Sequence, residues 1–444
     1  MKVDNIALKN YKGFEDCIVQ FHPRMNVFIG SNGSGKTSLM TALLKVLSKI
    51  VLTQTHQYSS EKMILKNEDI NYKENYASIT ATISDFINYP SSFKTFINTG
   101  AAQDLKSPSE IENQFKQVIK FLQDETISSV TIPIFKFYSA NRGTVAYKEV
   151  FHGSVYRISQ LETWSNIYQD DISYSKFLHW YFDNETDELR FQRDNNNFQI
   201  ESPRLRDVRT ALRIAFLELG YGSYNILSKQ IKIKGSSKLL PSVFLKNLDT
   251  GIEESLDNKS DGEKAIITLI ADIAYNLSIA KDYLIDDDFL KSPGIVMIDE
   301  IETHLHPKWQ REILPILSRI FPNIQFFVAT HSPQIVASVS SDSILVCDNF
   351  QVDNIHLKTK GEDSNSLLKY IFESTDRPKQ YIQLINEFES LMEKNADYSV
   401  LKNIIYKVEE KYNQDEGSSI SNLIDELNIR LAAYQFDKEY EKDR

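Results

Sequence analysis

Hydrophobic and polar positions near the N-terminus predict a hairpin, a buried strand and a helix, in that order. Residues 3–21 alternate apolar and polar side chains in two short runs on either side of Lys12 and Gly13, as the strands of a hairpin do. The run MNVFIG at residues 25–30 is mostly apolar and predicts a buried strand. Apolar residues at helical spacing over residues 36–50 complete a strand–turn–helix unit.

Further strands and helices follow along the chain. Residues 76–86 alternate like a strand, and residues 107–125 have helical spacing after a Ser-x-x-Glu start. Other apolar runs end in polar residues, which predicts buried strands at residues 131–142, 294–300, 324–332 and 343–349. Buried strands that alternate with helices are typical of the α/β class, which is the predicted fold class.

The middle and the end of the chain have a different pattern. Residues 143–228 are rich in helix and loop, with apolar positions three and four apart, and predict a mostly helical insertion. Residues 230–235 and 242–248 then resemble edge strands. Residues 349–444 predict a helical C-terminal tail, because apolar residues recur at the spacing of amphipathic helices.

The turn between the first buried strand and the first helix has the sequence GSNGSGKTS. It matches G-x-x-x-x-G-K-[ST], a loop whose backbone N–H groups surround phosphates, and it has the required strand and helix on its two sides. Lys36 would meet the β and γ phosphates of ATP, and the Thr37 hydroxyl would bind Mg²⁺. The predicted ATP-binding residues of this loop are Gly30, Ser31, Asn32, Gly33, Ser34, Gly35, Lys36, Thr37 and Ser38.

Two later strands end in residues suited to hydrolysis of a bound nucleotide. Asp299 and Glu300 follow the apolar run GIVMI, so that Asp299 would hold Mg²⁺ and Glu300 would activate the attacking water. His331 ends the run FFVATH and would contact the γ phosphate. We therefore predict Glu300 and His331 as catalytic residues, and Thr37 and Asp299 as metal ligands.

The segment KSDGEKA, residues 259–265, precedes a long apolar-periodic helix and has two interpretations. Ser260 and Glu263 have the spacing of a capping box, which would only begin the helix. Alternatively, Ser260, Gly262 and Glu263 belong to a second nucleotide-binding motif.

Composition restricts the cellular context. The net charge is −11 and there are two cysteines in 444 residues, which favours a reducing compartment and makes any contact with DNA local. No apolar run approaches the length of a membrane span, and the N-terminus has no signal-type stretch. The expected location is the cytoplasm, without a membrane partner.

The motif order resembles the ABC-type ATPase heads of the SMC, RecF and OLD-like groups, whose signature motif is a variant of Leu-Ser-Gly-Gly-Gln. The resemblance implies that Ser260 and Gly262 of one subunit complete the ATP site of the other, in a homodimer or higher oligomer. Lys259 stands where the family has leucine. The resemblance divides the chain into a head of residues 1–142 and 229–348, with the insertion and the tail described above. The family's Gln is not evident; Asn141 or Arg142 lies where it should fall.

The stretch IDEIETHLHPKWQREILPILSRIFPNIQFFVATHSPQIV resembles small AAA-type ATP-binding proteins once labelled virulence-associated. The Septu anti-phage ATPase PtuA belongs to that group, which includes members found beside retrons. This resemblance implies an ATPase subunit of a defence complex that regulates a separately encoded HNH nuclease (PtuB-like). It also implies a retron reverse transcriptase with its RNA–DNA as a further candidate partner. The tail would then be a docking or oligomerisation region.

Two other functions stay open. A DNA repair or recombination ATPase of the RecF or SMC type would act directly on DNA. The basic residues Arg204, Arg206, Arg209 and Arg213 favour a solvated helix face, and in a DNA-binding protein they would meet the phosphate backbone. A transporter ATPase subunit is the second alternative; no coupling glutamine or membrane partner signal supports it. Genomic neighbours would separate defence from transport, because an HNH nuclease gene would support the first and permease genes the second. Salt-dependent DNA binding by the isolated protein would support the repair function.

Overall fold

The computed structural model describes the chain in two compact units, Met1–Leu367 and Leu368–Arg444. The described residues are 1–55, 64–86, 92–100, 132–140, 167–169, 174–232, 239–280, 289–355, 358–362, 379–394, 396–412 and 427–435, with 113–114, 116–118, 120, 164, 366–367 and 424–425 between them. The predicted helix at 107–125 and the candidates Asn141 and Arg142 lie largely or wholly outside this set.

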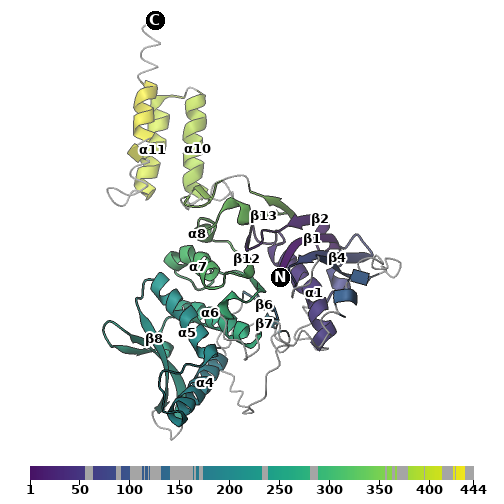
Figure 1. Cartoon of the computed structure of the whole chain (residues 1–444). Helices are drawn as coiled ribbons and strands as arrows, with labels where there is room; N and C mark the ends of the chain where they lie inside the picture. The colour runs from purple at the N-terminus through teal and green to yellow at the C-terminus, as the bar shows by residue number, and fades with distance from the viewer. Residues whose placement is uncertain are drawn as a thin grey trace. The chain divides into compact units, whose positions relative to one another are not determined.

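A seven-stranded sheet forms the centre of the first unit, in the order β14-β13-β3-β12-β11-β6-β7 (Figure 1). Its strands are β3 (Met25–Ile29), β6 (Ile134–Tyr138), β7 (Tyr168–Gln169), β11 (Gly294–Ile298), β12 (Ile324–Ala329), β13 (Ile344–Asp348) and β14 (Gln351–Asn354). All neighbours are parallel except β13 and β14. Strands β3, β6, β11 and β12 are buried at every position, as their apolar sequences predict. The predicted α/β class is confirmed.

A second, antiparallel sheet has the order β2-β1-β4-β5. It is built from β1 (Lys2–Tyr11), β2 (Phe14–Gln20), β4 (Tyr76–Ser84) and β5 (Phe93–Gly100). The predicted hairpin is therefore correct, whereas β5 was not predicted. Helix α1 (Lys36–Thr55) contacts β4, β5 and β12, and its apolar residues share one core with both sheets.

A third group of elements lies between β7 and β11 in the chain. Helices α4 (Tyr174–Asp194) and α5 (Pro203–Glu218) contact the three-stranded sheet β10-β9-β8 and the long helix α6 (Asp261–Ala280). The strands are β8 (Tyr224–Lys232), β9 (Leu239–Asn247) and β10 (Glu253–Ser255). Helix α5 also packs on α7 (Pro307–Ile320). The segment that the sequence assigns to helix and loop, 143–228, thus ends in a strand from Tyr224 onward.

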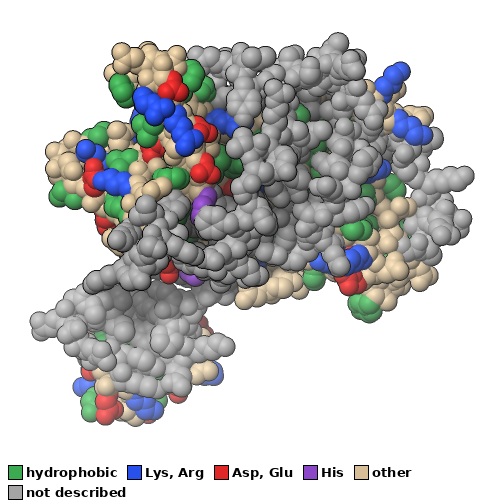
Figure 2. All heavy atoms as spheres, turned by 90° about the horizontal axis from the view of Figure 1, so that it is seen from below, with side chains coloured by type: hydrophobic (Ala, Val, Ile, Leu, Met, Phe, Trp, Pro, Cys, Tyr) green, Lys and Arg blue, Asp and Glu red, His purple; other side chains and the backbone are tan. Residues whose placement is uncertain are grey.

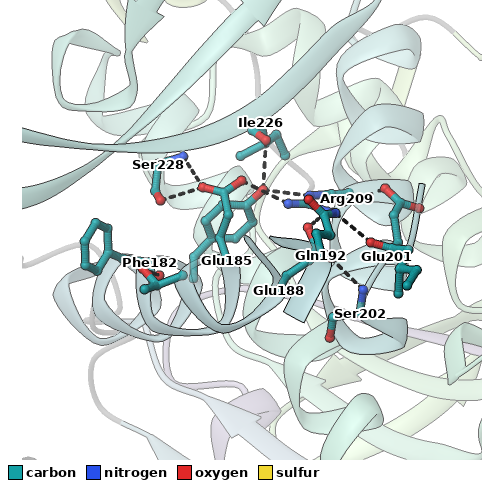
Figure 3. A network of polar contacts seen from close by, with 12 residues as sticks. Phe182, Glu185, Glu188, Gln192, Glu201, Ser202, Arg209, Ile226 and Ser228 are labelled. Carbon is teal, nitrogen blue, oxygen red and sulfur yellow. Dashed lines mark hydrogen bonds and ion pairs between the residues drawn. The ribbon is translucent and has the colours of Figure 1, made fainter. Parts of the chain in front are cut away.

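A buried ion-pair network holds this third group together (Figure 3). Arg209 on α5 donates to the Glu188 and Glu185 carboxylates on α4, each at 2.9 Å, and to the Tyr181 hydroxyl at 2.9 Å. The Glu185 carboxylate also accepts the Ser228 backbone N–H of β8 at 2.5 Å. Because buried charges are tolerated only when they are paired and hydrogen-bonded, this network fixes α4, α5 and β8 in one arrangement.

The tail begins differently from its sequence prediction. Strand β14, at Gln351–Asn354, pairs with β13 and belongs to the central sheet rather than to a helical segment. The second unit contains α10 (Lys379–Glu393), α11 (Tyr398–Tyr412) and the helical residues 424–425 and 427–435. Their apolar faces meet in a small core that includes Phe388, Leu401 and Leu427. In the part of the chain that the structure describes, no helix is long and apolar enough to cross a membrane.

Candidate functional site

The loop GSNGSGKTS joins β3 to α1, so that α1 begins at Lys36. Three of its residues have the positive φ angles that favour glycine: Gly30 at 146°, Gly33 at 81° and Gly35 at 111°. A Cβ atom at Gly30 would lie 2.1 Å from the Cys347 carbonyl oxygen of β13. The chain can therefore turn into the helix here only because these positions lack side chains.

Lys36 is buried and held inside the loop. Its Nζ donates to the Gly30 carbonyl at 2.9 Å and to the Ser31 carbonyl at 2.8 Å. Burial lowers the pKa of the Lys36 ammonium, an effect that Asp299 and other nearby acidic groups oppose. The ammonium thus lies at the positive N-terminal end of α1, where a phosphate group would be attracted.

Two residues that sequence analysis did not identify cover the loop. Phe350, in the turn between β13 and β14, has φ of 61°, which is rare for an aromatic residue. Its N–H donates to the Ser34 carbonyl at 3.0 Å, and its ring meets Phe14 edge-on, with centroids 5.3 Å apart. A Cβ atom at Gly35 would lie 3.0 Å from each of these rings. The turn at Phe350 thus holds the backbone of the phosphate loop in place. No short sequence pattern predicts these contacts.

The predicted metal ligands lie together. The Thr37 hydroxyl at the start of α1 donates to Asp299 Oδ2 at 3.0 Å. Asp299 follows β11 directly, and its backbone N–H donates to the Tyr138 carbonyl at the end of β6, at 2.9 Å. The hydroxyl and the carboxylate thus lie side by side at the carboxyl edge of the sheet. Ligands of α/β folds bind at this edge.

Glu300 and His331 follow neighbouring parallel strands, β11 and β12. Glu300 is exposed and has φ of 47°, an uncommon value for a residue other than glycine. Burial and the Lys36 ammonium lower the pKa of His331, while Glu302, Glu300 and Asp299 act in the opposite direction. The histidine is therefore neutral at physiological pH and offers one ring N–H donor and one acceptor.

Ser260, Gly262 and Glu263 lie at the N-terminus of α6. Glu263 Oε2 accepts the Ser260 hydroxyl at 2.6 Å and the Ser260 backbone N–H at 2.8 Å. The capping box is thus present, and among the described residues the Ser260 side chain is bound within its own motif rather than to the phosphate loop. Gly262 abuts the loop after β11, because a Cβ atom there would lie 2.3 Å from the His304 carbonyl oxygen.

Tyr221 is a further residue of this motif that sequence analysis missed. Its hydroxyl donates to Glu263 Oε1 at 2.7 Å, and the Lys259 ammonium lies 3.6 Å from the same oxygen. Lys259, which replaces the leucine of related motifs, also lies 2.7 Å from Glu254. Tyr221 follows α5 by three residues, so the ion-paired third group of elements contacts the signature-like segment directly.

The arginines of α5, which the sequence assigns to a solvated face or to DNA contact, differ in their exposure. Arg209 is buried in the ion-pair network of Figure 3, Arg204 and Arg206 are half-buried, and Arg213 is exposed. The face in Figure 2 also mixes basic and acidic side chains over its described part. Arg209 therefore belongs neither to a solvated face, which the sequence favoured, nor to a phosphate-binding row.

A protein-family model described as "AAA domain, putative AbiEii toxin, Type IV TA system" matches residues 25–337. Retron Ec83 probable ATPase from Escherichia coli is 26% identical, with 100% of this chain and 89% of that protein covered. Retron Vc95 probable ATPase from Vibrio cholerae is 25% identical, with 89% and 84% covered. Septu protein PtuA from Bacillus mycoides is 44% identical over 78 residues, which are 18% of this chain and 10% of that protein.

The family match extends from β3, which precedes the phosphate loop, through Asp299, Glu300 and His331 to the end of α8 (Pro333–Val336). It therefore contains the whole constellation that the structure assembles at the edge of the central sheet, and it covers most of the chain. The protein belongs to this AAA-domain family of P-loop ATPases and is related to retron ATPases and to PtuA.

Proposed function

We propose that the protein binds ATP with Mg²⁺ at the loop 30–38 and hydrolyses it between two copies of the chain, as the regulatory subunit of an anti-phage defence complex. The observation that carries the ATPase part is the meeting of Lys36, Thr37, Asp299 and His331 around one edge of the sheet. Lys36 and Thr37 lie at least 262 residues before Asp299 and His331 in the sequence. The fold alone does not require these particular side chains there.

The residues fit a magnesium ion that enters with the nucleotide. Thr37 and Asp299 supply one hydroxyl and one carboxylate, 3.0 Å apart, which are oxygen ligands of the kind Mg²⁺ takes beside phosphates. When bound, the ion supplies charge neutralisation at the phosphates. Lys36 would then turn from the loop carbonyls to the phosphate oxygens, and the loop N–H groups would surround them.

Glu300 and His331 would act on the reacting atoms. The exposed Glu300 carboxylate would accept a proton from the attacking water. The neutral His331 would donate a hydrogen bond to the γ phosphate from its ring N–H. Both groups lie on loops after neighbouring parallel strands, an arrangement that favours their joint action on one phosphate.

The dimer is supported by the position of the signature-like motif. Ser260 and Gly262 lie at a helix N-terminus whose dipole favours an anion, and Ser260 is exposed. In a two-fold arrangement, this N-terminus of one subunit would face the ATP held by the other, with Glu263 releasing the Ser260 hydroxyl. We therefore place Ser260, Gly262 and Glu263 in the same composite ATP site as the partner's phosphate loop.

The defence role and its partners are inferred from relatives. Two of them are named as retron ATPases and one as a Septu protein. A separately encoded HNH nuclease is accordingly the proposed client, together with a retron reverse transcriptase and its RNA–DNA where a retron is adjacent. The head of residues 1–142 and 229–348 would bind ATP, the insertion would support the signature motif, and the tail would dock the client.

Purification with the neighbouring gene products tests this function. The complex should contain the nuclease, and its mass should change between ATP and no nucleotide. A complex without any nuclease, together with salt-dependent DNA binding by the isolated chain, would favour the DNA repair interpretation instead. Copurification with a permease would favour the transporter interpretation.

A further inference from the structure

Glu302 lies in the loop between β11 and α7, two residues after Glu300. Its side chain reaches the loop that follows β12. Glu302 Oε2 accepts the Thr330 hydroxyl at 2.8 Å, and Oε1 accepts the His331 backbone N–H at 2.5 Å. One carboxylate thus joins the segment that carries Glu300 to the segment that carries His331.

The chemistry of the two donors suits a carboxylate. Thr330 is fully buried, and its oxygen already accepts the Ser332 N–H at 3.0 Å, so its proton is free to be donated to Glu302. The His331 N–H can only donate. An ionised carboxylate accepts hydrogen bonds from both donors at once. A glutamine amide has only one acceptor oxygen, so its NH₂ group would face one of the two donors.

A second side chain joins the same two loops from the opposite end. Gln310 on α7 donates to the Leu305 carbonyl at 2.9 Å and accepts the Ser332 hydroxyl at 2.6 Å. The segment 300–306 is therefore fixed to residues 330–332 at two places. Two such contacts would keep Glu300 and His331, which lie on separate loops, at a constant distance and orientation.

We propose that Glu302 is a positioning residue, which holds His331 in place relative to Glu300 during the hydrolysis inferred above. This proposal rests on the proposed function, because it assumes that His331 acts on the γ phosphate. We assign its effect to His331 because its two oxygens accept the Thr330 hydroxyl and the His331 backbone N–H. Glu300, two residues earlier, would accept the proton of the attacking water, whereas Glu302 would only position His331.

The test compares the full-length variants Glu302→Ala, Glu302→Gln and His331→Ala, with Glu312→Gln as control because Glu312 is exposed on the neighbouring helix α7. Glu302→Ala should lower kcat at least ~10-fold while KM for ATP stays within about twofold, because only the alignment of His331 is lost. The kcat of Glu302→Gln should lie between those of Glu302→Ala and wild type, because the amide oxygen still accepts the His331 N–H. The control should match wild type.

A double variant decides whether Glu302 acts through His331. Glu302→Ala in the His331→Ala background should cause little further loss, because groups that work as a unit are not additive. Losses that multiply, or a Glu302→Ala variant with unchanged kcat, would overturn the proposal. If His331→Ala alone hydrolyses ATP normally, the assigned role of His331 fails, and the positioning proposal falls with it.

Hydrogen exchange gives a measurement that does not depend on hydrolysis. The amide of His331 should exchange faster in Glu302→Ala than in wild type, with Glu302→Gln between them, because its acceptor is removed. Equal exchange in wild type and Glu302→Ala would contradict the proposed contact even if the enzyme is an active ATPase. The proposal and the proposed function can thus fail separately.

Discussion

The Thr37 hydroxyl lies 3.0 Å from Asp299 Oδ2, although 262 residues separate them in the sequence. This contact joins the start of α1, the helix after β3, to the end of β11, and both β3 and β11 pair with β12 in the central sheet. At the carboxyl edge of that sheet, the fold brings together functional side chains from segments that are distant in sequence.

Lys36→Ala and Glu300→Gln should impair ATP turnover in different ways. Lys36→Ala removes the buried ammonium that would meet the phosphates, so ATP binding itself should weaken. Glu300→Gln keeps the shape of the site but loses the proton acceptor, so ATP should still bind while kcat falls by about 10²-fold or more. Titration with a fluorescent ATP analogue and steady-state phosphate release separate the two. Normal turnover by Glu300→Gln would show that another group is the base.

Gly262→Ala should disturb the loop after β11. The new Cβ would lie 2.3 Å from the His304 carbonyl oxygen, so either α6 or that loop must shift. We expect a loss of ~1–3 kcal/mol in the free energy of unfolding and a lower kcat, with ATP binding to the phosphate loop retained. Chemical denaturation and hydrolysis assays measure both. An unchanged protein would mean that the two segments are not in contact.

Arg209→Leu should destabilise the first unit. It leaves the buried Glu185 and Glu188 carboxylates without their cation, which costs ~3–5 kcal/mol for a broken buried pair. Arg213→Leu is the matched control, because Arg213 is exposed on the same helix and its loss should be nearly neutral. Thermal unfolding of the two variants gives the comparison. Equal melting temperatures would contradict the buried network.

Removal of residues 368–444 should separate ATP binding from partner capture. The second unit has its own core, and the phosphate loop, Asp299 and His331 all lie in the first unit. The truncated protein should therefore bind ATP like the full chain but fail to copurify with the nuclease. Undiminished copurification would place the docking surface elsewhere in the chain.

Much of the site could be predicted from sequence because its signals are local. The phosphate loop, Asp299 and His331 each end or follow an apolar strand, and a short pattern marks each one. Tyr221, Glu302 and Phe350 could not be found in this way, because each acts through a partner that is distant in sequence. Phe350 also has a strained backbone that only tertiary contacts maintain.

The fold shows the same limit. Strands β3, β11, β12 and β13 are short apolar runs, and their patterns alone predict buried strands. Strand β5 and the start of β8 contain polar residues at many positions and are strands because neighbouring strands supply their hydrogen bonds. Arg209 was misinterpreted for a related reason, since α5 resembles a basic surface helix until its carboxylate partners on α4 are known.

The most direct test of the composite site is the mixing of two inactive variants, Lys36→Ala and Ser260→Ala. Each alone should hydrolyse ATP poorly, because every site would lack either the lysine of one subunit or the serine of the other. In an equimolar mixture, half of the dimers would contain one intact site, so activity should recover to about a quarter of wild type. If Ser260→Ala alone hydrolyses ATP at the full rate, or if mixing restores nothing, two chains do not share the site.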